Sequence, residues 1–358
     1  MSFWNTFSEF FSRESKKYKT LFLSPEQVDV ESDATPFKKG EAYCRVWLVE
    51  MRLAKGVEWF TQRYPVVHSS IRFDHGGQKV TIPNLAGPGF LKELTKENLD
   101  RIIQCNYPLT PLFPFNRGLV ELQAGLFSMI TNDQVGNFMN TLCQFSKLLP
   151  VPELSSVLKL ADPVYDGIQN LLGVSDGRLE LGYQQTFTGM NGGGSNTLTP
   201  GYFVAILAEA SEIDDNTLCI VNDSLRIRTQ GETEEFKGYS YMLFRLEKSP
   251  NQDWESLTRI KEQVYQAQEA VVKGENEQAK KILTAIKIAV FQSADLTKAD
   301  KRQMVLKIEA ELKEWGLEAT KGPISEPSLY AIMQRSLPTI DSETEGELEV
   351  LEKFFDRN

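Results

Sequence analysis

The chain has 358 residues, of which 41% are hydrophobic and 25% are charged, and at roughly 100–200 residues per domain this length predicts two domains, or one domain with an appendage. Its 49 acidic and 39 basic residues give a net charge of −10, which repels phosphate backbones and makes nucleic acid a poor partner. The apolar runs are far shorter than the roughly 20 residues of a membrane-spanning helix, and we expect no secretory signal peptide.

An amphipathic arm is predicted at the amino end, within an arm and linker that together span residues 1–40. Its aromatic side chains recur at the spacing of one helix face; they are Phe3, Trp4, Phe7, Phe10 and Phe11. Such a stripe can pack on the protein's own body, dock on a partner protein or lie in a membrane surface. The segment is only weakly basic, so the membrane surface is the least favoured of the three.

A β-rich body is predicted for residues 41–250, with a helical insertion at about 134–172 and a short helix after Thr95. Stretches rich in β-branched and aromatic residues alternate with turn signals; the predicted strands are 43–53, 66–74, 78–82, 117–130, 178–187, 201–208, 217–221 and 238–247. The sequence His75-Gly76-Gly77 predicts a hairpin turn between two of them. Short strands at this spacing favour an antiparallel sheet or sandwich over alternating strand–helix units.

A bundle of three amphipathic helices is predicted for residues 251–317. Asp253 caps the first helix and Gly274 ends it, while Thr297 with Asp300 resembles a capping box that opens the third. The predicted fold class is therefore α+β: an antiparallel, sandwich-like β body with a helical insertion, followed by a C-terminal three-helix region.

The last segment, residues 318–358, is predicted to be an acidic and largely mobile tail, because prolines interrupt it and acids outnumber bases. It carries one apolar stripe, formed by Leu348, Leu351, Phe354 and Phe355. With the aromatic arm, these residues are the predicted contacts to a partner or a membrane. Asp341 is a candidate processing site, since proteases cut exposed mobile segments.

Candidate catalytic groups are few, and none forms a recognisable constellation. The two histidines, His68 and His75, are the available imidazole bases, and we expect a strand and a turn there. Each of the four cysteines has apolar neighbours and none shows CxxC spacing, which favours reduced core thiols and a cytoplasmic location; they are Cys44, Cys105, Cys143 and Cys219. A Cys–His hydrolase is therefore the weakest alternative.

Three further motifs each have an ordinary structural explanation that we prefer. Two acidic motifs, Asp214-Asp215-Asn216 and Asn222-Asp223, are expected in loops. Their residue types are typical of turns, which we prefer to a calcium site. The Gly192–Gly194 run lacks phosphate-loop spacing and suits a hairpin connection. Prolines 108, 111 and 114 repeat like a polyproline ligand, but their apolar neighbours favour a partly buried crossing of the core.

The sequence therefore predicts a non-enzymatic interaction, regulatory or adaptor protein. The β body would be a platform, the helices a docking module and the termini mobile recognition elements, with another protein as partner. No catalytic residue, metal or cofactor is predicted. The alternative is an effector that associates with or perturbs membranes through the aromatic arm. On the leading hypothesis, deletion of residues 1–20 or 321–358 should abolish partner capture and leave the thermal melt nearly unchanged.

Overall fold

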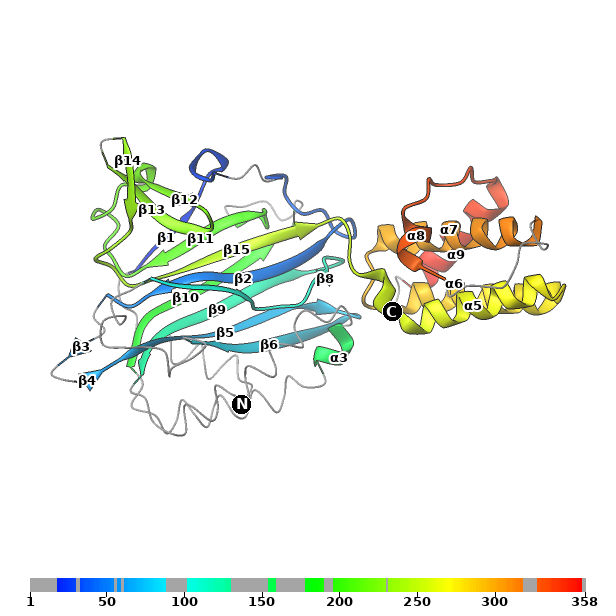
Figure 1. Ribbon diagram of the computed structural model, residues 1–358, viewed down its shortest axis with the longest axis horizontal. Helices are drawn as coiled ribbons and strands as arrows, with labels where there is room; N and C mark the ends of the chain where they lie inside the picture. The colour runs from blue at the N-terminus through cyan, green and yellow to red at the C-terminus, as the bar shows by residue number, and fades with distance from the viewer. Residues whose placement is uncertain are drawn as a thin grey trace.

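A computed structural model describes residues 18–29, 33–54, 57–58, 61–87, 102–129, 154–158, 178–189, 196–229, 231–317 and 327–355. In this part, the chain forms a β-rich body and a helical module that lie side by side (Figure 1). The fold class is α+β, as predicted, with antiparallel sheets in the body and most helices near the carboxyl end. Within the described residues, no helix is both long and apolar enough to cross a bilayer.

One layer of the body is a six-stranded sheet in the order β1-β11-β15-β2-β7, with β8 also paired to β2. Its strands are β1 (Lys19–Phe22), β11 (Gly201–Ile206), β15 (Tyr241–Ser249), β2 (Tyr43–Arg52), β7 (Ile103–Pro108) and β8 (Phe113–Pro114). Every ladder is antiparallel. The central strand β2 is buried along most of its length, which is why its sequence is apolar on both faces.

The second layer is a four-stranded antiparallel sheet in the order β10-β9-β5-β6. Its strands are β10 (Arg178–Thr188), β9 (Leu119–Met129), β5 (Tyr64–His75) and β6 (Gln78–Ala86). The predicted hairpin turn is present between β5 and β6, where Gly76 and Gly77 both have positive φ, as the tightest hairpin turns require.

The two sheets share one hydrophobic core, so the body is a sandwich. Aromatic rings join the layers at its centre: the ring of Tyr183 on β10 lies 5.7 Å from that of Phe203 and 5.9 Å from that of Phe244. The chain between β7 and β8 does not cross the core as the proline spacing predicts: both strands pair with β2, and the segment stays beside β2, where Leu109 is buried.

A small third sheet covers the outer face of the six-stranded sheet, with its own apolar cluster between them. It consists of β12 (Leu218–Val221), β13 (Ser224–Thr229) and β14 (Glu232–Glu235). The remaining short elements of the body are β3 (Val57–Glu58), β4 (Thr61–Gln62), η1 (Pro25–Gln27), η4 (Asp215–Thr217) and α3 (Leu154–Leu158).

The helical module begins with η5 (Trp254–Ser256) and continues through α5 (Thr258–Val272), α6 (Asn276–Gln292), α7 (Lys298–Leu317), α8 (Leu329–Met333) and α9 (Ser342–Phe355). The helices α6 and α7 lie where the sequence predicts them, whereas α5 begins at Thr258, later than predicted, because Asp253 caps the separate turn η5. The amide of Asp300 donates to the Thr297 hydroxyl at 3.0 Å, which is half of the predicted capping box. One apolar core joins all of these helices.

Two segments differ from their predictions. Residues 19–22, expected to belong to the arm and linker, instead form β1, because they complete the ladder of β11 and stack Phe22 on Phe203. Residues 327–355, expected to be a largely mobile tail, instead carry α8 and α9. The apolar faces of both helices are covered by the core of the module, which outweighs the acidic composition of the segment.

Several predictions concern residues outside the described part of the chain. These are the helix after Thr95, the insertion at 134–172 apart from α3, the Gly192–Gly194 run, Cys143, and the aromatic arm with Phe3, Trp4, Phe7, Phe10 and Phe11.

Candidate functional site

The body and the module are joined by a buried hydrogen-bond network around the start of α7. The hydroxyl of Tyr43, on β2, donates to Asp300 Oδ2 at 2.5 Å and accepts from the amide of Thr297 at 3.2 Å. The indole of Trp254 donates to the same carboxylate oxygen at 3.2 Å. Burial raises the pKa of Asp300, and the two donated hydrogen bonds oppose this effect by stabilising its charged form.

Backbone contacts reinforce the joint on one side of this network. The amide of Ala299 donates to the carbonyl of Gly40 at 3.0 Å. Asn116 accepts from the amide of Lys298 at 3.2 Å and donates to the carbonyl of Leu296 at 2.9 Å. Gly40 has φ +79°, and a Cβ there would come within 3.1 Å of the Lys298 side chain, so the contact requires a glycine.

Replacement of Tyr43 by Phe should weaken this joint. The change removes one donor to a buried carboxylate and one acceptor from a buried amide, so we expect the free energy of unfolding to fall by about 1–3 kcal/mol in urea titrations. The matched control is Tyr265→Phe on α5, at a more exposed site, which should change it by less than about 0.5 kcal/mol. Equal stability of the two variants would contradict this role.

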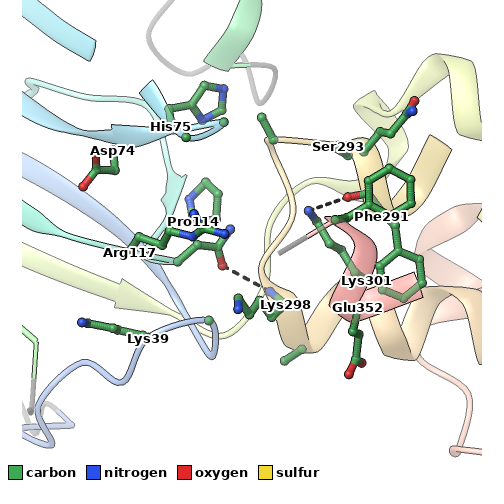
Figure 2. A pocket seen from close by; sticks show the side chains of 18 of the residues that line it. Lys39, Asp74, His75, Pro114, Arg117, Phe291, Ser293, Lys298, Lys301 and Glu352 are labelled. Atoms are coloured by element: carbon green, nitrogen blue, oxygen red, sulfur yellow. Dashed lines mark hydrogen bonds between the residues drawn. The ribbon is translucent and has the colours of Figure 1, made fainter. Parts of the chain in front are cut away.

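A cavity of about 680 Å³ lies beside the joint, between the body and the module (Figure 2). The body contributes the loop before β2, the β5–β6 turn and the segment after β8, and the module contributes the end of α6, the start of α7 and the end of α9. Its charged lining residues are Lys39, Glu41, Asp74, Arg117, Lys298, Lys301, Arg302 and Glu352. Five of these eight are basic.

The basic side chains of the cavity come from both the body and the module. Lys39 and Arg117 lie on the body, and Lys298, at the first turn of α7, lies close to the body with its side chain beside Gly40 (Figure 2). Deeper on the module side, Lys301 donates to the carbonyl of Phe291 at 2.9 Å. Arg302 forms an ion pair with Glu352 at 3.1 Å, so these two lining charges largely cancel.

His75 lines the same cavity, from the last position of β5. Burial, with a smaller contribution from the positive charge of Lys301, lowers the pKa of its imidazole to about 4. Asp295 lies 3.5 Å from Nε2, but this contact does not outweigh the cost of burying a charged ring. His75 is therefore neutral at physiological pH.

Of the other candidate catalytic groups that the structure describes, His68, Cys44 and Cys219 are buried in the body and Cys105 is partly buried. His68 lies on β5 and burial lowers its pKa to about 3, so it too is neutral. Burial raises the pKa of the Cys105 thiol to about 12 and raises that of Cys44 further, and Cys219 is also buried. A general base works best with a pKa near the working pH, and a thiol nucleophile needs a lowered one. His68 therefore lacks the pKa of a general base, and Cys44 and Cys105 lack that of a nucleophile.

The predicted contact residues of the tail divide between the two sides of α9. Leu348 is 1% exposed, and Leu351 and Phe355 pack against the core of the module. Phe354, in contrast, is 62% exposed. The predicted stripe is thus mostly an internal face of the module.

Asp341, the candidate processing site, lies directly before α9 and is exposed. Its carboxylate accepts from the amide of Thr344 at 2.8 Å, as a helix cap does, and this bond lowers its pKa. Cleavage after Asp341 would therefore cut the chain at the beginning of a helix whose other face is buried.

The acidic loops of the body act as turns. The Asp214 carboxylate caps η4 by accepting from the amide of Asn216 at 3.0 Å. Asn222 and Asp223 both have positive φ and connect β12 to β13, a conformation that these residue types tolerate. The Asp223 carboxylate also pairs with Arg245 at 3.2 Å. Its Oδ1 also accepts from the Tyr202 hydroxyl.

The cavity could not be predicted from the sequence, because no local pattern indicates it. Lys39, Arg117 and Lys298 come from a linker, a strand connection and a helix start, and each is ordinary where it stands in the sequence. Comparison with models of protein families, with curated proteins and with solved structures finds no match for this chain. The function of this chain is therefore inferred from its own geometry.

Proposed function

We propose that this chain is a non-enzymatic protein-interaction or regulatory protein, and that it binds its partner through the outer face of α9. The observation that carries the proposal is the solvent exposure of two apolar side chains four residues apart on that helix. Val350 is 66% exposed and Phe354 is 62% exposed. Residues four apart lie on the same helix face, so the two side chains form one apolar pair.

The rest of the module fixes this face in place. Leu348 anchors the inner side of α9 in the core. Ion pairs hold its flanks, from Arg302 to Glu352 and from Lys287 to Glu347 at 2.9 Å. A helix that presents an apolar pair from a rigid support suits insertion into an apolar groove. The acidic composition of α9 favours a groove with a basic rim.

The state of the buried imidazoles and thiols supports a binding role over the hydrolase alternative. His68 and His75 are neutral at physiological pH, and the Cys44 and Cys105 thiols resist ionisation. A protein that acts through its surface has no need of a reactive group among these side chains.

The test is quantitative affinity capture from the native cell with the full chain. We expect V350S/F354S to lose the specifically enriched proteins, at least tenfold relative to the unchanged chain, because the apolar pair no longer fills the groove of the partner. The matched control is Y265S, which replaces a partly exposed aromatic residue on α5 and should retain them. Equal capture by all three proteins would refute a binding role for α9.

A further inference from the structure

The cavity between the body and the module is mainly basic, although the chain as a whole is acidic. The protein as a whole carries −10, yet the lining holds five basic and three acidic side chains. Apart from Arg302 and Glu352, which pair with one another, the lining has four basic side chains and two acidic ones, Glu41 and Asp74. Glu41 also forms an ion pair with Lys38 at 3.6 Å, which further weakens the negative side.

The basic groups that remain are spread across the two walls of the cavity. Lys39 and Arg117 come from the body, while Lys298 and Lys301 come from the first turn of α7 (Figure 2). A single compact anion contacts one such group or two neighbouring ones. Several basic groups that line one cavity suit a ligand that carries several negative charges.

The size and the remaining lining restrict the class of ligand further. A volume of about 680 Å³ lies within the range of ordinary small-molecule sites. Phe291 and Phe355 line the module side, with ring centroids 6.3 Å apart and nearly parallel planes. The cavity thus offers a cationic part and an aromatic part. A long polyanion such as nucleic acid would extend beyond the cavity into the field of an acidic protein.

We propose that this cavity binds a small polyphosphate, that is, a ligand with two or more linked phosphate groups. The phosphates contact Lys39 and Arg117 of the body and Lys298 of the module. Any organic group attached to them faces Phe291 and Phe355. Because the ligand touches both the body and the module, its binding stabilises their docked arrangement, and this stabilisation grows with the logarithm of the ligand concentration once that exceeds Kd.

The experiment is isothermal titration calorimetry of the full chain with three probes: inorganic tripolyphosphate, ATP and adenosine. We expect tripolyphosphate and ATP to bind, with affinity that falls as salt rises, and adenosine alone not to bind. Tighter binding of ATP than of tripolyphosphate assigns the aromatic side to a nucleoside, and equal binding assigns the site to the phosphates alone. Absence of binding by both phosphate compounds at millimolar concentration would overturn the proposal.

Charge variants test whether binding occurs in this cavity. R117Q/K298Q should weaken tripolyphosphate binding at least tenfold. The control R178Q/K280Q removes the same charge from exposed positions on β10 and α6 and should change it less than twofold. An equal loss in both variants would show attraction to the whole surface and refute the site.

A second readout uses the two histidines and does not depend on affinity. Lys301 lowers the pKa of His75, so phosphate bound beside it should raise that pKa and shift the imidazole resonances in NMR spectra. Asp295 lies beside this ring and Asp74 lines the same cavity, and both stay in place. His68, seven residues back along β5 and thus roughly 23 Å away, serves as the internal control. A tripolyphosphate complex without a shift at His75 would place the ligand elsewhere and refute the proposal.

Discussion

Deletion of residues 321–358 should unfold the helical module, or lower its melting temperature sharply, while the β body stays folded. The deletion removes four side chains that are buried in the core of the module: Leu329, Ile332, Met333 and Leu348. Burial of one such side chain contributes about 1.5–3 kcal/mol, so the loss is comparable to the whole stability of a small domain. This expectation reverses the one drawn from the sequence, in which the same deletion leaves the melt unchanged. Circular dichroism at 222 nm follows the helices directly.

A point variant separates this effect from the shortening of the chain. L348A should cost about 2–5 kcal/mol in urea unfolding, because it leaves a cavity in the module core. F354A on the same helix alters an exposed side chain and should cost less than about 0.5 kcal/mol. If L348A proved as stable as F354A, the packing of α9 described above would be incorrect.

The two buried histidines should make the free energy of unfolding fall as the pH is lowered from 7 to 5. Their pKa values are about 3 for His68 and about 4 for His75 in the folded chain, against about 6.5 when unfolded. Below pH 6.5 the unfolded chain takes up protons that the folded chain does not. Each histidine then costs about 1.4 kcal/mol per pH unit, or about 4 kcal/mol for both by pH 5.

The pH effect is isolated by comparing variants, because other groups titrate in the same range. Burial raises the pKa values of Glu50 and Asp300, so the folded chain takes up protons there first and gains stability on acidification. These groups are the same in the parent and in H68Q, so their effect cancels in the difference. The free energy of unfolding of H68Q should depend less on pH, by about 2 kcal/mol between pH 7 and 5. Parallel curves would contradict the buried, neutral state of His68.

The elements that were predicted correctly carry their signal in consecutive residues. The apolar period of α7, with Thr297 before it and Gly316 in its last turn, depends only on neighbours along the chain. The same is true of the Gly76-Gly77 turn, which needs two residues that accept positive φ. In contrast, β14 has the sequence ETEE and is exposed throughout. Its sequence has no alternation of apolar and polar residues that would predict a strand. It forms a strand because its backbone pairs with β13.

The carboxyl-terminal segment also shows that local sequence predicts an element, whereas packing decides whether it is buried. Its sequence contains the apolar stripe of α9, but the acidic composition and the prolines of the segment predict that it is mobile. Whether such a stripe is buried depends on a complementary surface, which the module provides through residues such as Ile286 and Leu306. A short amphipathic helix of this kind gains most of its stability from that contact and little from its own propensity.

Local patterns in this chain thus decide the class of each long element, its ends and the polarity of its faces, since these follow from interactions within a few residues. The joint at Tyr43 and Asp300 and the basic cavity beside it depend on contacts between residues more than 250 positions apart. Such contacts arise only when the sandwich and the helices have packed and set the distances between their surfaces. Packing, and no local motif, brings Lys39, Arg117 and Lys298 to one cavity.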